Sequence, residues 1–250
     1  MTGVITSGAR GIGGAGLSDA SLAPILERAF TKGKPSAVAL VINSPGGSPV
    51  QSSLIGARIR RLADEKKVPV YAFCEDVAAS GGYWLACAAD EIYVDASSVV
   101  GSIGVISASF GFHEFMERQG IERRVHTAGE NKSMMDPFRP EKPEEIERLK
   151  AIQSQIHDTF IDHVKTSRGT KLADENLFTG EVWVGQKAVD IGLVDRVGHL
   201  RPVLEEKFGK TVKLMAYARK PSFARRFGLS QALNPIAQIE ERAHWARFGL

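Results

Sequence analysis

An uninterrupted run of six apolar residues, 37–42, constrains the fold of this chain more than any other segment. Its length suits a β-strand, and its lack of polar alternation is typical of a parallel strand covered by helices on both faces. Similar apolar segments at residues 68–74 and 92–94 predict further strands, with helical spacing between them. Strands that alternate with helices predict a layered, largely parallel α/β fold.

The remainder of the chain continues this alternation. Ser18 or Asp19 is a suitable N-cap for a first helix. Small residues at 78–89 predict another helix, and further helices are expected at 112–119, 144–167 and 186–191. Strands are expected at 102–106, 124–127 and 212–215. Because no internal repeat or linker divides these elements, we predict one domain over residues 1–218, followed by a basic amphipathic tail at 219–250.

The charge of the chain argues against nucleic-acid binding. Its 250 residues carry a net charge of +3, and the basic residues are dispersed. A nucleic-acid-binding protein usually concentrates Lys and Arg in a stripe with aromatic residues among them. No run of 18 apolar residues predicts a membrane span, and the first residues lack the layout of a signal peptide. We therefore expect a cytoplasmic protein, with peripheral contact to the inner membrane through the tail as an extension of that expectation.

The candidate metal ligands and histidine bases have ordinary sequence surroundings. Cys74 and Cys87 lie in apolar segments without C-x-x-C spacing, which predicts buried thiols and no zinc site. A Ser-His-Asp triad would need a histidine placed by the fold. Four of the six histidines fall on predicted helices with charged neighbours and are expected at the surface: His113, His157, His163 and His244.

The glycine-rich segment at residues 6–13 is similar to the phosphate-binding turn of short-chain dehydrogenases. That turn must follow a strand, and only two apolar residues precede it here. The Tyr-x-x-x-Lys pair of those enzymes is absent after all four tyrosines. A glycine pattern alone is weak support for dinucleotide binding, so we predict a loop.

Two other segments could carry chemistry. Asn43-Ser44-Pro45-Gly46-Gly47 follows the first apolar run, and its glycine N–H groups could stabilise an oxyanion or simply form a tight turn. Ser80 lies among small residues at a predicted helix start, where a helix N-terminus favours developing negative charge. Gly81 and Gly82 would leave room for substrate there. The alternative role for Ser80 is that of an N-cap.

The motifs SPGGS, AASGGYW, GSIGVI and AGENKSMMDPF occur in this order. Together they resemble the signal peptide peptidase A family of serine–lysine endopeptidases, over residues 38–197. The resemblance implies Ser80 as nucleophile and Lys132 as general base. It implies that the Gly47 and Gly81 N–H groups form the oxyanion hole and that Ser102 hydrogen-bonds the lysine.

The same resemblance implies the fold of the caseinolytic protease and crotonase group, an α/β fold of stacked β-β-α units. It implies unfolded or membrane-derived peptides, such as signal-peptide remnants, as substrates. A ring-shaped homo-oligomer is implied, and no metal or organic cofactor is required. We further expect the peptide to bind extended, between the segment at 102–106 and the turn at 44–48.

Lys132 can act as a base only when it is neutral, which requires a desolvated site that lowers its pKa. The neighbouring apolar residues Met134, Met135, Pro137 and Phe138 could supply such a site. Asp136 would oppose the shift unless its carboxylate points away.

Two rival functions and one departure from the family pattern remain open. A crotonase-type hydratase or isomerase would use a similar oxyanion hole with an acidic residue in place of the serine, and an inactive scaffold would keep only the fold. Family members usually carry an N-terminal membrane anchor. This chain begins almost at its first strand, so we expect a short member or a start assigned too late. The basic tail from Arg219 could bind a membrane surface, with an oligomer contact or a frayed terminus as alternatives.

Overall fold

The computed structural model describes residues 1–7, 16–173, 176–218 and 242–250. Contacts divide the chain into two compact units. Met1–Gly104 and Phe160–Leu250 form the first, which we call the sheet unit. Val105–Thr159 forms the second, which we call the inserted unit because it interrupts the first in sequence.

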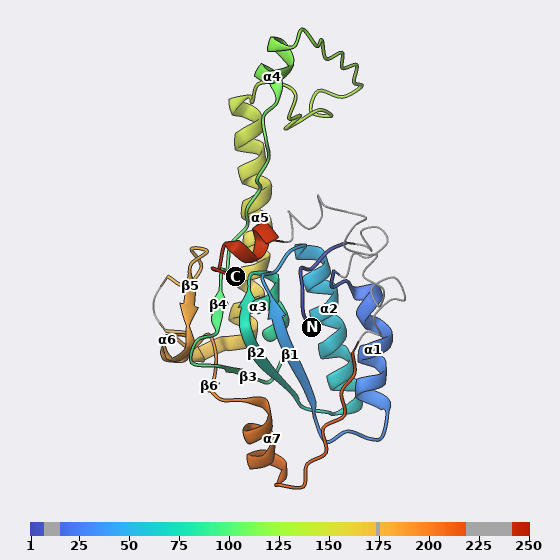
Figure 1. The fold of residues 1–250 in the computed structure, drawn as a ribbon, viewed down its shortest axis with the longest axis vertical. Helices are drawn as coiled ribbons and strands as arrows, with labels where there is room; N and C mark the ends of the chain where they lie inside the picture. The colour runs from blue at the N-terminus through green and yellow to red at the C-terminus, as the bar shows by residue number, and fades with distance from the viewer. Residues whose placement is uncertain (8–15, 174–175, 219–241) are drawn as a thin grey trace. The chain divides into compact units, whose positions relative to one another are not determined.

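Helices and strands alternate in chain order except where β4 follows β3 directly and where α4, α5 and η1 are consecutive (Figure 1). They are α1 (Asp19–Thr31), β1 (Val38–Ser44), α2 (Pro49–Lys66), β2 (Val70–Ala79), α3 (Gly81–Ala86), β3 (Glu91–Val94), β4 (Val99–Gly101), α4 (His113–Arg118), α5 (Pro143–Arg168), the 3-10 turn η1 (Gly169–Lys171), β5 (Val182–Val184), α6 (Gly185–Asp190), β6 (Arg196–Val197) and α7 (Leu200–Phe208).

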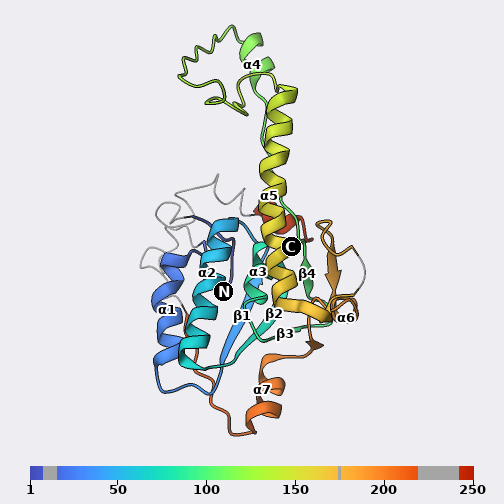
Figure 2. The same ribbon diagram turned by 180° about the vertical axis from the view of Figure 1, so that it is seen from behind.

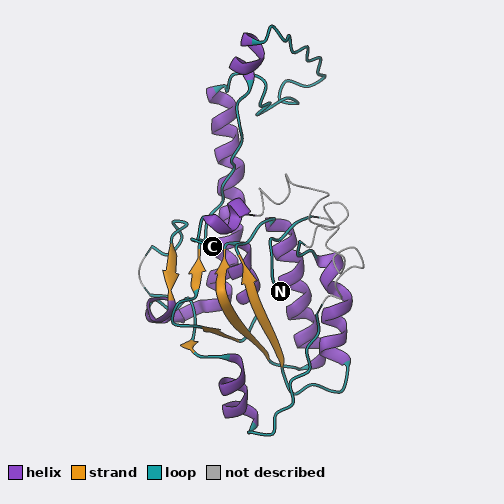
Figure 3. Ribbon diagram, in the orientation of Figure 1, coloured by secondary structure: helices purple, strands orange, loops and turns teal. Residues whose placement is uncertain are grey.

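The strands of the sheet unit form one curled mixed sheet (Figure 3). The ten-residue β2 is central: its first half pairs in parallel with β1 and β3, and its last three residues pair in parallel with β4. β6 adds to β3 in parallel, and β5 pairs with β4 antiparallel. Because β1, β2 and β4 are parallel neighbours, the turns that follow them lie at the same edge of the sheet. The predicted α/β class, of the caseinolytic protease and crotonase type, is confirmed.

Alternate residues of the strands face two apolar clusters. Val70, Ala72 and Cys74 point to the main core, which α1, α2, α3 and the end of α5 complete (Figure 2). Tyr71 and Phe73 point to the opposite face, where they pack with Tyr93 and α7; this second cluster is completed by Val203 and Leu204. This alternation follows from the two-residue period of a strand, and both faces are covered as the unbroken apolar runs predicted.

The first helix begins as the sequence predicts. Ser18 caps α1 and forms a capping box with Ser21. Ser48 caps α2, and Pro49 occupies its first turn, where a missing N–H costs nothing. These caps fix the points at which α1 and α2 leave the turns before them.

The inserted unit contains α4 and the first part of α5, joined by extended chain and turns. Phe112 and Phe138 stack with ring centroids 5.7 Å apart, and the Phe112 N–H donates to Pro137 O. Several large apolar side chains of this unit are exposed: Ile106, Phe110, Phe115, Ile121 and Ile152. The unit therefore keeps little of its apolar surface from solvent.

Four element predictions are wrong. The segments 124–127 and 212–215 form no strand in the described chain, because no neighbouring strand pairs with them. The strand expected at 102–106 lies earlier, at β4. The helix expected at 78–89 begins only at Gly81, because Ala78 and Ala79 pair with Val100 and Gly101.

Several predictions concern residues outside the described ranges. Residues 8–15 include most of the glycine-rich segment, and 219–241 include the start of the basic tail. The domain boundary at residue 219 and the role of the tail therefore stay predictions. Among the helices that the structure describes, none combines the length and apolar character needed to cross a bilayer. Cys74 and Cys87 are buried free thiols, as predicted.

Candidate active site

Ser80 forms the turn between a strand and a helix. β2 ends at Ala79 and α3 begins at Gly81, so Ser80 is the single residue that connects the strand to the helix. Its backbone angles are φ 52° and ψ −122°. A positive φ on a non-glycine residue costs roughly 1–3 kcal/mol and persists only where surrounding structure enforces it. The Ser80 N–H donates to Gly101 O at 2.8 Å, and Ser80 O accepts from the Trp84 N–H at 3.0 Å. A strained serine at a sharp strand-to-helix turn is the arrangement that exposes the nucleophile in α/β-hydrolases.

The Ser80 hydroxyl is not used in holding this turn. Its side chain makes no capping hydrogen bond to α3, and none with any other described residue. The side chain is half-buried. Ser80 therefore occupies the N-cap position of α3 without capping it through its side chain, and no described residue hydrogen-bonds its Oγ.

The glycine turn after β1 packs directly on Ser80. A Cβ atom on Gly46 would lie 2.7 Å from Ser80 Cβ and 2.7 Å from Gly81 N. Gly47 has φ +140°, and a Cβ there would lie 2.0 Å from Ile5 O. Ile5 also binds this turn by hydrogen bonds to Gly46 O at 2.8 Å and from the Ser48 N–H at 2.9 Å. The N-terminal segment and Ser80 thus enclose the turn from two sides, and only glycine fits between them.

Two backbone donors beside Ser80 have no acceptor in the part of the chain that the structure describes. Neither the Gly47 N–H nor the Gly81 N–H makes a hydrogen bond with a described residue. The two lie close together, since a Cβ on Gly81 would be 3.4 Å from Gly47 N. A pair of preorganised N–H groups next to a nucleophile can stabilise the oxyanion of an acyl-transfer intermediate.

Gly81 and Gly82 serve packing, which corrects the expectation that they leave room for substrate. A Cβ on Gly81 would lie 2.3 Å from Ser52 Oγ of α2, and one on Gly82 would lie 2.4 Å from Ser44 O. The missing side chains therefore let α3 approach the glycine turn and α2 closely. This close approach is what brings the Gly81 N–H beside that of Gly47.

Ser102 repeats the features of Ser80 on the neighbouring strand. It follows the end of β4, has φ 52°, and is 7% exposed. Its N–H donates to Glu181 O at 2.6 Å, while its hydroxyl makes no hydrogen bond with a described residue. The hydrogen bond from Ser80 N–H to Gly101 O ties the two serines to one another. The structure thus brings Ser80, Gly47, Gly81 and Ser102 together at one edge of the sheet.

A cavity of about 430 Å³ opens beside Ser102. Its walls come from the β4–β5 region and from the C-terminal residues, and comprise Ser102, Gly180, Glu181, Val182, Trp183, Arg247 and Phe248. Sequence reasoning missed this cavity. Its two walls are far apart in the sequence, and the antiparallel pairing of β4 with β5 carries no local signal.

Lys132 belongs to the inserted unit, so its pairing with Ser80 stays a prediction. The Lys132 side chain is exposed, and the backbone N–H of this residue donates to Gly129 O at 3.2 Å. Asp136, expected to oppose a neutral lysine, is occupied by other partners: Arg123 Nε lies 2.9 Å from its carboxylate. A hydrogen bond from the Phe138 N–H, with Arg123 second, holds the pKa of the Asp136 carboxyl below its usual range.

The two aromatic residues after Ser80 face the core as expected. His163, in contrast, departs from its predicted surface position. Tyr83 and Trp84 are buried. His163 was predicted at the surface, yet it is half-buried and stacks on Trp84 with ring centroids 4.4 Å apart. Burial lowers its pKa, although a hydrogen bond to Trp84 O opposes this. His163 is drawn toward the core because it shares a face of α5 with the buried residues Phe160 and Val164.

The sequence model of Peptidase family S49 matches residues 62–212, which include Ser80, Ser102 and Lys132. A protein of Brucella abortus (strain 2308) named Na(+)/H(+) antiporter NhaA is 51% identical over 94% of this chain and 34% of its own length. A putative protease of Methanocaldococcus jannaschii is 34% identical over 78% of this chain and 60% of its own. The chloroplastic serine protease SPPA of Arabidopsis thaliana is 36% identical over 67% of this chain and 25% of its own.

These matches agree with the class that the fold and the candidate site indicate, a peptidase. The chain belongs to peptidase family S49. It spans about a third of the Brucella protein's length.

Proposed function

We propose that this chain is a serine endopeptidase in which Ser80 is the nucleophile and Lys132 the general base. One observation carries the proposal: Ser80 is held in a strained strand-to-helix turn, and neither its hydroxyl nor the neighbouring N–H groups of Gly47 and Gly81 hydrogen-bond a described residue. Such strain persists at sites where function requires it. Membership of a peptidase family supports the choice of the peptide bond as the bond attacked.

The reaction divides into two acyl transfers. Ser80 Oγ attacks the carbonyl carbon of the scissile bond while neutral Lys132 accepts the hydroxyl proton. The carbonyl oxygen becomes an oxyanion, which the N–H groups of Gly47 and Gly81 stabilise. As the C–N bond breaks, Lys132 returns the proton to the amine, leaving an acyl ester on Ser80. Water, deprotonated by Lys132, then releases the acid and restores the serine.

Lys132 must lose its proton before it can act. An exposed ammonium is strongly favoured over the neutral amine, and burial is what reverses this preference. Because Lys132 is exposed in its own unit, bound peptide and assembly of the chain would have to bury it. The pairing of Asp136 with Arg123 helps, since the charge of that carboxylate is already balanced. Ser102, with its free hydroxyl, is the proposed hydrogen-bond partner that orients the amine.

The proposed substrates are unfolded or membrane-derived peptides, such as signal-peptide remnants. An extended peptide exposes its scissile bond and backbone groups, which a site at a sheet edge can read by main-chain hydrogen bonds. The cavity beside Ser102 would take one side chain; Val182, Trp183 and Phe248 give it apolar walls, and Ser102, Glu181 and Arg247 give it polar ones. We expect small or aliphatic residues before the cut.

We also propose that the chain assembles into a homo-oligomeric ring. Exposed large apolar residues of the inserted unit, among them Phe110 at 78%, would be buried at subunit contacts. The antiporter names of the Brucella relatives support a place of action near a membrane, which the basic tail could contact.

A library of unstructured peptides tests this function. We expect cleavage after small or aliphatic residues by the wild-type protein, and none by Ser80→Ala. A dominant preference for a charged residue before the cut would contradict the proposed specificity. Equal cleavage by Ser80→Ala would contradict the proposed nucleophile.

A further inference from the structure

The position of α3 determines the position of the reacting groups. This helix has six residues and begins directly after Ser80. A helix this short is not stable by itself, so tertiary contacts must hold it. The Gly81 N–H belongs to its first turn, and the strained Ser80 backbone continues into it. Any shift of α3 would therefore move both the nucleophile and one oxyanion donor.

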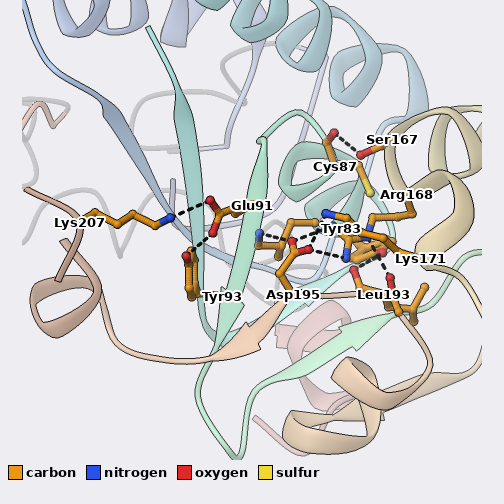
Figure 4. Close-up of polar contacts among 12 residues, drawn as sticks. Tyr83, Cys87, Glu91, Tyr93, Ser167, Arg168, Lys171, Leu193, Asp195 and Lys207 are labelled. Atoms are coloured by element: carbon orange, nitrogen blue, oxygen red, sulfur yellow. Dashed lines mark hydrogen bonds and ion pairs between the residues drawn. The ribbon is translucent and has the colours of Figure 1, made fainter.

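Tyr83 provides a contact that fixes the first turn of α3. Its side chain is 0% exposed, and its hydroxyl donates to Leu193 O at 2.6 Å (Figure 4). Burial raises the pKa of Tyr83 well above its usual range, so the phenol keeps its proton and remains a donor. The residue lies three positions after Ser80, and its hydrogen bond reaches a segment 110 residues away in sequence.

The acceptor of this hydrogen bond is itself anchored. Arg168 is 3% exposed and donates to Gly192 O at 2.9 Å, on one side of Leu193. It also makes a bidentate pair with Asp195, at 2.8 and 3.2 Å, on the other side. The Asp195 carboxylate further accepts from Lys171 at 2.6 Å. The Leu193 carbonyl thus lies between two residues held by one buried arginine (Figure 4).

The end of α5 also binds the C-terminal carbonyls of α3. Ser167 Oγ donates to Cys87 O at 2.7 Å. His163 Nε2 lies 3.1 Å from Trp84 O and must donate, because a carbonyl can only accept. These bonds satisfy carbonyl groups that a helix end leaves without partners. They restrain the far end of α3, while Tyr83 restrains the end next to Ser80.

Tyr93 offers a matched comparison within the same sheet. Its hydroxyl also donates to one partner, the Glu91 carboxylate. It packs with Phe73 in the second apolar cluster, on the face of the sheet opposite α3. Both phenols appear in Figure 4. Each hydroxyl also interacts with a second side chain, Cys87 for Tyr83 and Lys207 for Tyr93, so the two substitutions remove comparable contacts. Only Tyr83 belongs to the helix that follows Ser80.

We propose that Tyr83 is a positioning residue for peptide hydrolysis: its hydrogen bond to Leu193 O holds α3 so that Ser80 Oγ and the Gly81 N–H keep the spacing that attack requires. The inference rests on the proposed function, because it takes Ser80 as the nucleophile. Tyr83 touches neither the substrate nor the reacting atoms in this role. It acts only through α3.

The test compares Tyr83→Phe with Tyr93→Phe in the full chain. For Tyr83→Phe we expect kcat to fall roughly 10- to 100-fold with KM within about twofold, because small misplacements of reacting groups have effects of this size. The rate at which a fluorophosphonate labels Ser80 should fall by a similar factor. Tyr93→Phe should change kcat, KM and the labelling rate by less than about twofold, since its hydroxyl does not contact α3. Ser167→Ala, which releases the other end of α3, should give the same split between kcat and KM with a smaller effect.

The outcomes separate this inference from the function it rests on. Wild-type kcat and labelling rate in Tyr83→Phe would overturn the positioning role while Ser80 remains the labelled nucleophile. A raised KM at unchanged kcat would overturn it too, because that indicates loss of uniform binding. If Tyr83→Phe does not fold, Ser167→Ala decides: an unchanged kcat there contradicts the inference. Absence of labelling at Ser80 in the wild-type protein would contradict both the proposed nucleophile and the positioning role of Tyr83.

Discussion

The edge of the sheet that carries Ser80 and the loop that carries Lys132 are built in opposite ways. Around Ser80, backbone hydrogen bonds, close glycine contacts and a buried helix fix each group. Lys132 is exposed in a unit whose large apolar residues are also largely exposed. The difference indicates that the fold of the sheet unit preorganises the proposed nucleophile and the proposed oxyanion donors. The contacts that would bury the proposed base lie outside the inserted unit.

The largest expected effect concerns the preorganised side. Ser80→Ala should lower peptidase activity by roughly 10⁴-fold or more, because the attacking atom is lost. The fold should remain, since the Ser80 hydroxyl makes no hydrogen bond with a described residue. Steady-state hydrolysis of an unstructured peptide measures the loss. Ser97→Ala, at an exposed serine of the same unit, is the control and should retain full activity.

The next effect concerns the base. Lys132→Arg should lower kcat nearly as much as Lys132→Ala, roughly 10²- to 10⁴-fold, because a guanidinium stays protonated and cannot accept a proton. Lys142→Arg, at another exposed lysine of the inserted unit, should have no effect. Steady-state hydrolysis of an unstructured peptide measures both effects. Substantial activity in Lys132→Arg would mean that the residue binds substrate as a charge.

Two glycines with positive φ distinguish the effect of a steric clash at the site from the general cost of a strained backbone. Gly47→Ala places a Cβ 2.0 Å from Ile5 O and should displace the oxyanion donor, lowering kcat roughly 10²- to 10³-fold. Gly33 also has a positive φ, +77°, but a Cβ there meets nothing within 4 Å. Gly33→Ala should therefore cost only about 1–2 kcal/mol of stability and leave kcat unchanged. Equal kcat in both variants would show that the turn is not part of the site.

Sequence reasoning identified the candidate site residues through local motifs but did not predict the long-range contacts that fix their positions. The strand before Ser80 and the helix after it follow from apolar runs and small residues. The strained backbone at Ser80 depends on Gly101, whose strand was placed several residues too late. A Cβ on Gly101 would lie 2.7 Å from Trp183 Cε3, a contact between residues far apart in sequence. Contacts of this kind leave no periodic pattern.

The ion pair between Arg168 and Asp195 is expected to affect stability more than catalysis. Burial by itself would raise the pKa of Asp195, but hydrogen bonds from Arg168 and Lys171 outweigh it and hold that pKa below its usual range. A carboxyl whose pKa is lower in the folded state adds stability above its unfolded pKa, about 3.9, and loses it as pH falls through the folded value. Acid unfolding monitored by circular dichroism should therefore begin at higher pH in Arg168→Met. That variant should also lose about 1–3 kcal/mol at neutral pH, because Asp195 loses its bidentate partner and keeps only Lys171 and the Ile92 N–H. Arg201→Met, which removes an exposed ion pair with Glu205, should unfold like the wild-type protein.

The central claim is that the sheet unit alone preorganises Ser80 as a nucleophile. Reaction of the wild-type chain with a serine-reactive fluorophosphonate, followed by peptide mass spectrometry, tests it most directly. We expect one modified residue, Ser80, with labelling abolished in Ser80→Ala and retained in Ser102→Ala. Modification at another serine, or equal labelling of Ser80→Ala, would contradict the account.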